Sequence, residues 1–167
     1  IYSVMMERFI FDDIEVDTAN IVQYESFPND SKLSITLHPY LDEFFLDLDE
    51  VDITLNAGIA HNIIGLGGGD DIVDGGHGND TIRGGGGNDT IRGGYGDDRL
   101  NGGSGTNILW GDDGQDIFDA DTEIGDYKVT IHNGIYTFTS GLGDSHELHD
   151  IVFVAFTAEE SGMLGSK

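Results

Sequence analysis

Residues 75–101 read GGHGNDTIRGGGGNDTIRGGYGDDRLN, three nine-residue units placed end to end. The unit LGGGDDIVD precedes them, and GGSGTNILW and GDDGQDIFD follow, so the repeat covers residues 66–119. A weaker copy, AGIAHNIIG, occupies residues 57–65. A short fixed period of this kind is typical of a solenoid, in which each unit contacts only its neighbours.

Each unit follows the pattern G-G-x-G-x-D-x-U-x, where U is apolar. Its six glycine-dominated residues predict a turn, and its last three predict a very short strand whose middle side chain points inward. Two units then complete one coil, with a strand in each of two sheets. The sequence therefore predicts an all-β fold, a parallel β-roll that is a two-sheet solenoid. Its core is the column Val73, Ile82, Ile91, Leu100, Leu109 and Phe118.

The flanks of the repeats also read as β structure. Counting back by nines from Val73 gives four apolar residues, Ile64, Leu55, Leu46 and Leu37. We expect an N-terminal β segment over residues 1–56 that extends the roll from about residue 37; ordinary sandwich strands are the alternative. The roll itself is expected over residues 57–119.

A C-terminal β cap and tail are expected over residues 120–167. The stretch DYKVTIHNGIYTFTS predicts a hairpin, because alternating apolar residues flank Asn133-Gly134, a pair favoured in type I′ turns. The stretch LHDIVFVAF, which follows the hairpin, is expected to form one buried strand.

Charge and composition limit the possible partners. The chain has 32 acidic and 7 basic residues, a formal net charge of -25. Nucleic acid is therefore an unsuitable partner, since phosphate binding needs Lys and Arg. There is no Cys, which excludes disulfides and thiolate metal sites. The longest apolar run, IVFVAF at residues 151–156, is too short to span a membrane.

One apolar residue in nine makes a thin core, and ordering a glycine-rich chain costs much entropy. Something that binds the folded state must therefore supply stability. The residues at the sixth position of each unit offer a binding site of this kind. Asp71, Asp89 and Asn107 fall on one edge of the roll, called here the first edge. Asn62, Asp80, Asp98 and Asp116 fall on the second edge, where Asp116 ends the column.

Carboxylates stacked at coil spacing repel each other unless a cation lies between them. Carboxylate and carbonyl oxygens suit Ca²⁺, whereas Zn²⁺ prefers Cys or His and Mg²⁺ rarely uses an all-protein cage. We predict about three firm calcium sites between Asp pairs and one or two weaker ones at Asn62 and Asn107. The predicted ligands are the carboxylates of Asp71, Asp80, Asp89, Asp98 and Asp116. Turn carbonyls are expected from Gly68, Gly69, Gly75, His77, Gly78, Gly84, Gly85, Gly86, Gly87, Gly93, Gly94, Tyr95, Gly96, Gly103, Gly105, Asp112 and Gly114.

The units GGHGND, GGGGND and GGYGDD resemble the RTX family, whose nonapeptide repeats bind Ca²⁺ in a parallel β-roll. The resemblance implies a bacterial protein exported by type I secretion and located outside the cell or at its surface. It also implies a module of a larger secreted polypeptide that stays unfolded in the cytosol and folds outside on meeting Ca²⁺. The alternative is a polysaccharide- or surface-binding module, similar to the R-modules of alginate epimerases.

The remaining motifs favour no second chemistry. No nucleophile elbow, HExxH or phosphate loop is present, so we do not expect an enzyme. His146 and His149 are expected to be incidental, and DLDEVD at residues 47–52 lacks the glycine and final Glu of an EF-hand loop. Arg83, Arg92 and Arg99 either balance local charge or contact an anionic polysaccharide. Trp110, with Ile72 and Ile108, is expected to pack under a flanking β segment.

Overall fold

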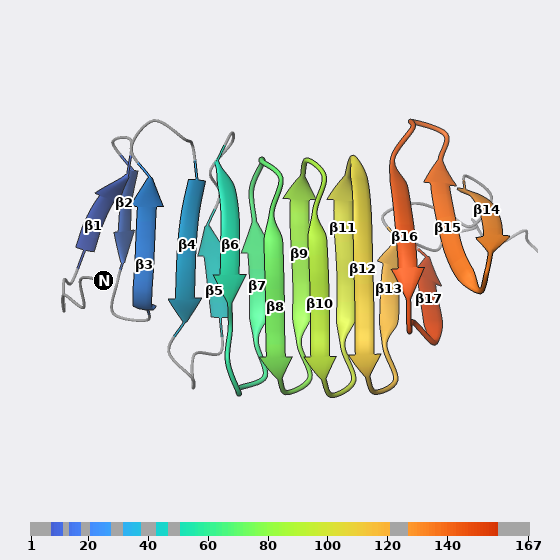
Figure 1. Ribbon diagram of the computed structural model, residues 1–167, viewed down its shortest axis with the longest axis horizontal. Coiled ribbons are helices and arrows are strands. Elements are labelled where there is room, and N and C mark those ends of the chain that lie inside the picture. The colour runs from blue at the N-terminus through green and yellow to red at the C-terminus, as the bar shows by residue number, and fades with distance from the viewer. Residues whose placement is uncertain are drawn as a thin grey trace, which may run out of the picture.

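The computed structural model describes residues 8–11, 14–17, 21–27, 32–37, 43–46, 51–120 and 127–156. All their regular structure is β, and two long sheets run along the molecule (Figure 1), as predicted for a parallel β-roll. The nine-stranded sheet contains, in spatial order, β14 (Tyr127–His132), β15 (Ile135–Ser140), β16 (Ser145–His149), β12 (Thr106–Asp113), β10 (Thr90–Tyr95), β8 (Ile72–His77), β6 (Asp52–Asn56), β4 (Lys32–Leu37) and β3 (Ile21–Phe27).

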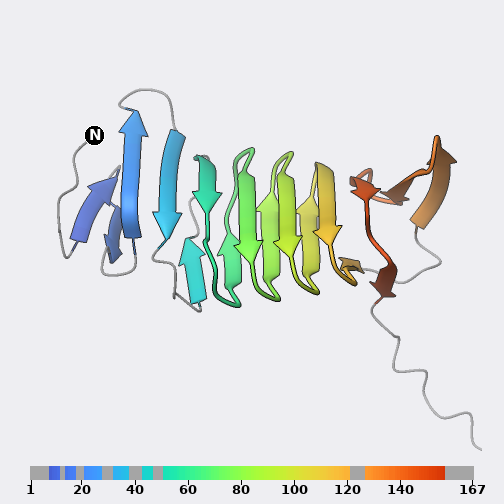
Figure 2. The same cartoon turned by 60° about the horizontal axis from the view of Figure 1, so that its bottom comes forward.

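The six-stranded sheet contains β17 (Phe153–Phe156), β13 (Ile117–Ala120), β11 (Arg99–Ser104), β9 (Thr81–Gly86), β7 (Ile63–Leu66) and β5 (Glu43–Leu46). A separate antiparallel pair is formed by β1 (Arg8–Phe11) and β2 (Ile14–Asp17). Within the roll the chain alternates between the two long sheets, whose strands run in opposite directions in Figures 1 and 2. Each strand therefore pairs with the strand two units away.

The register within the repeats follows the predicted coil of two units. Ile91 stands between Val73 and Leu109 in one sheet, and Leu100 stands between Ile82 and Phe118 in the other. The predicted core column is buried throughout, with at most 1% of any of its six side chains exposed. The apolar period therefore identified the core correctly.

The strands are longer than the three residues predicted. In β8, β9, β10 and β11 each strand has six residues, because the first three positions of the next unit continue the ladder. Gly94, for example, stands opposite Gly76. Gly94 has a φ of 109°, and a Cβ added there would collide with the Gly76 carbonyl oxygen. Glycine thus allows the backbones to approach closely enough to pair, and only the fourth to sixth positions form the turn.

The coils continue on the N-terminal side of the repeats. Strand β4 pairs in parallel with β6, and β5 pairs in parallel with β7. The predicted register there is wrong by two residues. Ile35, not Leu37, stands opposite Leu55, and Phe44, not Leu46, stands opposite Ile64. These coils have 20 residues because their turns lack the compact glycine pattern.

The C-terminal hairpin is formed by β14 and β15, and its two loop residues both have positive φ, 52° at Asn133 and 85° at Gly134. This agrees with the predicted type I′ turn. The expectation of one strand over LHDIVFVAF is wrong. Asp150, with a φ of 54°, separates β16 from β17, and these strands pair in parallel with β12 and β13. The chain therefore makes one further coil after the hairpin.

The hairpin closes this end of the roll. Strand β15 runs antiparallel to β16, so the nine-stranded sheet changes direction there. An aromatic group formed by Phe118, Tyr127, Phe138 and His146 lies at this junction, with the rings of Phe118 and Phe138 5.6 Å apart. The predicted C-terminal tail lies outside the described residues. The described residues contain no helix of the length and apolarity that a membrane span requires.

Candidate metal centre

The sixth residue of each unit is buried at an edge of the roll, immediately before a strand or, for Asn107, at the start of one. Asp71 and Asp116 have no exposed surface, and Asp80, Asp89 and Asp98 are 1% exposed. Asn62 and Asn107 are buried in the same two columns. Burying an ionised carboxylate is costly unless a partner compensates for its lost hydration. The contacts of these oxygens therefore indicate what the site can hold.

One oxygen of each carboxylate has a backbone partner in the preceding coil. The Oδ1 atom of Asp98 accepts a hydrogen bond of 2.7 Å from the Asp80 N–H. The same bond links Asp89 to the N–H of Asp71 (3.0 Å) and Asp116 to the N–H of Asp98 (2.9 Å). This ladder orients every carboxylate in the same way.

The second oxygen, Oδ2, is buried without a hydrogen-bond partner among the described residues in Asp71, Asp80, Asp89, Asp98 and Asp116. In Asp80, Asp89, Asp98 and Asp116 this oxygen lies against the first glycine of its own unit. A Cβ added at Gly75 would lie 2.7 Å from Asp80 Oδ2 and 2.6 Å from the carbonyl oxygen of Gly93, one coil further on. A Cβ at Gly84 would meet Asp89 Oδ2 and, at 3.0 Å, the Gly102 carbonyl oxygen. Carboxylate oxygens that lack a hydrogen-bond donor and lie beside a carbonyl oxygen fit a hard divalent cation such as Ca²⁺.

Burial also changes the acidity of the columns. It raises the pKa of Asp71 and of Asp80 to about 7, although the backbone hydrogen bond to each carboxylate opposes the shift. Burial raises the pKa of Asp89 and of Asp98 to about 6 against the same opposing bond. The ionised columns are therefore unfavourable in the metal-free roll, and a bound proton or cation relieves them.

The two edges differ in the number of adjacent carboxylates. Ile53 precedes Asp71 on the first edge, where its N–H donates to Asp71 Oδ1 at 2.8 Å. Asn107 follows Asp89, so the first edge has a single pair, Asp71/Asp89. The second edge has two pairs, Asp80/Asp98 and Asp98/Asp116. Within the described residues no three His, Asp or Glu side chains gather around one point, so backbone oxygens must complete any metal site.

The predicted carbonyl ligands fall into distinct groups. At the third position, the carbonyl of Tyr95 already accepts a backbone bond of 2.8 Å from the N–H of Gly78. Carbonyls at the fourth position, as at Gly69 and Gly78, point at the matching glycine of the next coil. The first-position carbonyls of Gly93 and Gly102 lie nearest the Asp Oδ2 atoms. The sequence prediction included Gly93 but missed Gly102.

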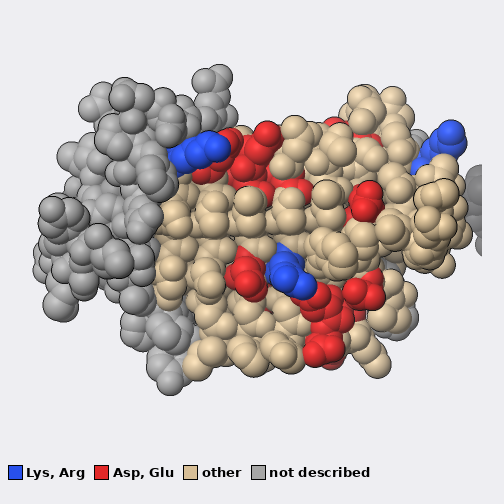
Figure 3. All heavy atoms as spheres, viewed as in Figure 1, with Lys and Arg blue, Asp and Glu red and all other residues tan. Residues whose placement is uncertain are grey.

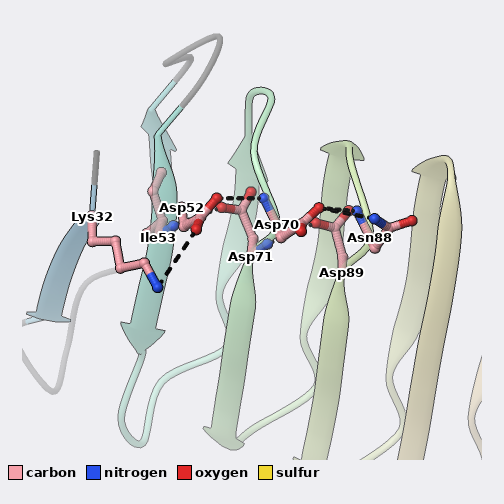
Figure 4. A network of polar contacts seen from close by, with 7 residues as sticks. All are labelled: Lys32, Asp52, Ile53, Asp70, Asp71, Asn88 and Asp89. Atoms are coloured by element: carbon pink, nitrogen blue, oxygen red, sulfur yellow. Dashed lines mark hydrogen bonds and ion pairs between the residues drawn. The ribbon is translucent and has the colours of Figure 1, made fainter. Parts of the chain in front are cut away.

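A second ladder, which sequence reasoning missed, uses the fifth position of each unit (Figure 4). Asp52 Oδ1 accepts from the Asp70 N–H at 2.9 Å, and Asp70 Oδ1 accepts from the Asn88 N–H at 2.7 Å. Lys32 lies 3.9 Å from Asp52 at the start of this ladder. In this ladder each backbone N–H donates to a side chain one coil earlier in the chain. In the buried ladder each N–H donates to a side chain one coil later. Of the DLDEVD motif, residues 47–50 lie outside the described residues.

Arg92 and Arg99 both have acidic partners on the roll. Arg92 binds Asp112 through two nitrogens, at 2.5 and 3.1 Å, and Arg99 lies 2.8 Å from Asp119. Acidic side chains gather beside a basic one on the face shown in Figure 3.

Trp110 stacks on His149 of β16, with ring centres 3.8 Å apart. Trp110 therefore packs against a flanking strand as expected, whereas the expectation is wrong for Ile72 and Ile108, which are exposed.

His146 and His149 do not converge on one point. His146 is 2% exposed and stands in register with Asn107, whose Nδ2 lies 3.3 Å from His146 Nδ1. His149 lies 2.7 Å from Glu147. His146 thus continues the first edge with an aromatic-packed side chain, and no carboxylate follows Asn107 there.

The comparison with protein families agrees with this geometry. The model of the RTX calcium-binding nonapeptide repeat matches residues 57–91 and 92–122, with four copies. A search of curated proteins finds no matching relative.

Proposed function

Because residues 57–122 belong to the RTX calcium-binding nonapeptide repeats, we propose that Ca²⁺ binds along both edges of the roll and drives its folding. The observation that carries this proposal is the set of five buried Asp Oδ2 atoms without a hydrogen-bond partner among the described residues. The side chains of Asp71, Asp80, Asp89, Asp98 and Asp116 would hold the ions. First-position carbonyls such as those of Gly93 and Gly102 would complete the shells.

The expected occupancy follows the distribution of charge. Firm sites are proposed between Asp71 and Asp89 on the first edge, and between Asp80, Asp98 and Asp116 on the second. Asn62/Asp80 and Asp89/Asn107 would bind more weakly, since each pair offers one carboxylate. A ligand present at 100 times its Kd stabilises the folded state by about 2.7 kcal/mol per site. Three such sites supply about 8 kcal/mol, comparable to the whole stability of a typical domain.

In the cell, this dependence would make the module a folding switch for an exported protein. The chain would remain unfolded at the low Ca²⁺ concentration of the cytosol and become rigid at the millimolar Ca²⁺ outside. RTX repeats are typical of exported bacterial proteins, which supports an extracellular location. We assign the module a role in folding and secretion of a larger polypeptide rather than in catalysis. The ion pairs of Arg92 and Arg99 favour local charge balance over binding of an anionic polysaccharide.

The test is circular dichroism of the chain in metal-free buffer and during titration with Ca²⁺, with Mg²⁺ as the control cation. We expect a largely unfolded roll without Ca²⁺ and a cooperative gain of β signal as Ca²⁺ rises, with little effect of Mg²⁺. Identical spectra in the presence and absence of Ca²⁺ would falsify the proposal.

A further inference from the structure

The second edge does not end where its repeats end. A Cβ added at Gly111 would meet Asp116 Oδ2 and, at 2.5 Å, the carbonyl oxygen of Asp150. The interior coils show the same arrangement: Asp80 Oδ2 and the Gly93 carbonyl converge at Gly75. Asp150, which belongs to no repeat, therefore places its carbonyl oxygen where a further repeat would place the carbonyl oxygen of its first glycine.

Contacts on both sides hold Asp150 in this place. His149, the residue before it, stacks on Trp110 at an angle of 11° between the rings. The N–H of Val152, two residues later, donates to the Asp116 carbonyl oxygen at 3.1 Å. Three residues, 150–152, thus connect β16 to β17, whereas six residues, 111–116, separate the positions of the last repeat that pair with the ends of these strands, Trp110 and Ile117.

Asp116 supplies an independent indication of a ligand here. Its side chain has no exposed surface, and its Oδ2 atom has no hydrogen-bond partner among the described residues. Burial raises the pKa of Asp116, and the negative charges of Asp97, Asp112 and Asp150 add to this shift. Of these, Asp112 is paired with Arg92, whereas the ion pairs found among the described residues do not include Asp116 or Asp150.

We propose that Asp116 and Asp150 form an additional calcium site, which joins the last repeat to the C-terminal coil. Asp116 Oδ2 and the Asp150 carbonyl oxygen are its ligands, and the exposed Asp150 carboxylate supplies the second negative charge. Asp116 therefore borders two ions, not one as its place at the end of the repeat column suggested. The inference rests on the proposed function, because it requires that Ca²⁺ occupy the Asp columns.

The test compares Asp150→Asn with Asp113→Asn by calorimetric titration of the whole chain with Ca²⁺. Both variants remove one negative charge from the same pocket, which Asp113 and Asp150 line together. Asn tolerates the positive φ of residue 150. Asp150→Gly is a second variant, which keeps the carbonyl and suits this backbone conformation.

Asp150→Asn and Asp150→Gly are expected to bind one calcium ion fewer, or to bind one ion about tenfold more weakly. Amide hydrogen exchange of β16 and β17 in Ca²⁺ should become faster in both variants. Asp113→Asn should match the parent chain in both measurements. Parent-like stoichiometry, affinity and exchange in the two Asp150 variants, while the chain still folds with Ca²⁺, would overturn the added site alone. If the parent chain itself fails to bind Ca²⁺, the proposed function and this site are both wrong.

Discussion

Asp98 accepts through Oδ1 a hydrogen bond of 2.7 Å from the backbone N–H of Asp80, exactly one coil earlier in the chain. Asn107 accepts an equivalent bond of 2.7 Å from Asp89. The ladder therefore needs an oxygen at the sixth position but not a negative charge. This separates the structural role of the residue from its proposed role as a metal ligand, and it makes the Asp-to-Asn change an informative one.

Asp98→Asn should keep the ladder and weaken the two calcium sites that Asp98 borders. We expect the Ca²⁺ concentration at half-folding to rise about tenfold or more, because fewer charged ligands bind Ca²⁺ less tightly. Asp97→Asn is the matched control: Asp97 is exposed, and its Oδ1 bond to Gln115 (2.9 Å) can be made by an amide. Circular dichroism during Ca²⁺ titration measures both variants. Equal shifts for the two variants would contradict a ligand role for Asp98.

Gly93→Ala should disturb a metal site without straining the backbone. A Cβ at residue 93 would collide with Asp98 Oδ2, and residue 93 is not among the positions of positive φ. We expect a higher Ca²⁺ midpoint and a lower melting temperature in saturating Ca²⁺. Gly141→Ala is the control, since a Cβ there meets no atom within 4 Å. A Gly93→Ala chain as stable and as calcium-sensitive as the control would show that this space holds no ligand.

Calcium binding should depend on pH in a defined direction. The pKa values of about 7 for Asp71 and Asp80, and of about 6 for Asp89 and Asp98, lie above the ordinary 3.8. Between about pH 4 and 7 the metal-free folded roll therefore binds more protons than the unfolded chain, so its stability falls as pH rises. Calcium must displace these protons from the folded metal-free roll, so the apparent calcium affinity of that folded state should increase from about pH 5 to 8.

Calorimetric titration in two buffers of different ionisation enthalpy measures the released protons. We expect proton release near pH 6 in proportion to the fraction of the metal-free chain that is folded, and little at pH 9, because the Asp carboxylates of the unfolded chain keep the ordinary pKa of 3.8 and are already ionised. Metal-free samples should also show more β signal near pH 4 than at pH 8. A calcium affinity that stays constant across this range would mean that the Asp carboxylates are already ionised before Ca²⁺ binds.

Ile91→Ala should destabilise the calcium-loaded roll by about 2–5 kcal/mol, the usual cost of truncating a buried aliphatic side chain to alanine. Ile91 is 0% exposed and stands at the centre of the core column, whereas Ile72 is 54% exposed and forms the control Ile72→Ala. Chemical unfolding in saturating Ca²⁺ measures both. Similar losses for the two variants would contradict the assignment of the inward-facing column.

The period of nine was sufficient to predict the inward column and both acidic edges, because each unit repeats the same backbone path. Asn133-Gly134 likewise predicted its turn, since this pair favours positive φ at both loop residues. The period could not predict the N-terminal register, where the coil lengthens to 20 residues between Ile35 and Leu55. Without the glycine pattern, nothing in the sequence sets the length of those turns.

The roles of His146 and Asp150 were also beyond the repeat pattern. A hairpin lies between these residues and the last unit, so counting by nines does not lead to them. Their positions follow from strand pairing, in which Asn107 stands opposite His146 and Ile117 stands opposite Phe153. The fifth-position ladder was missed because Asp, Asn, His, Thr and Gln all occur at that position. No single residue type therefore marks the ladder in the sequence.

The reversal of strand direction at β15 has a consequence for the size of the particle. The last parallel strand of an uncovered solenoid has unpaired backbone groups, which could pair with a further coil or with another molecule. Copies joined in this way grow into open filaments. In the nine-stranded sheet, β16 covers β12, and the antiparallel β15 and β14 then occupy the place of any further parallel strand. The hairpin thus ends the series of parallel strands, so the edge that this sheet presents here is antiparallel β14 and not the edge of another coil.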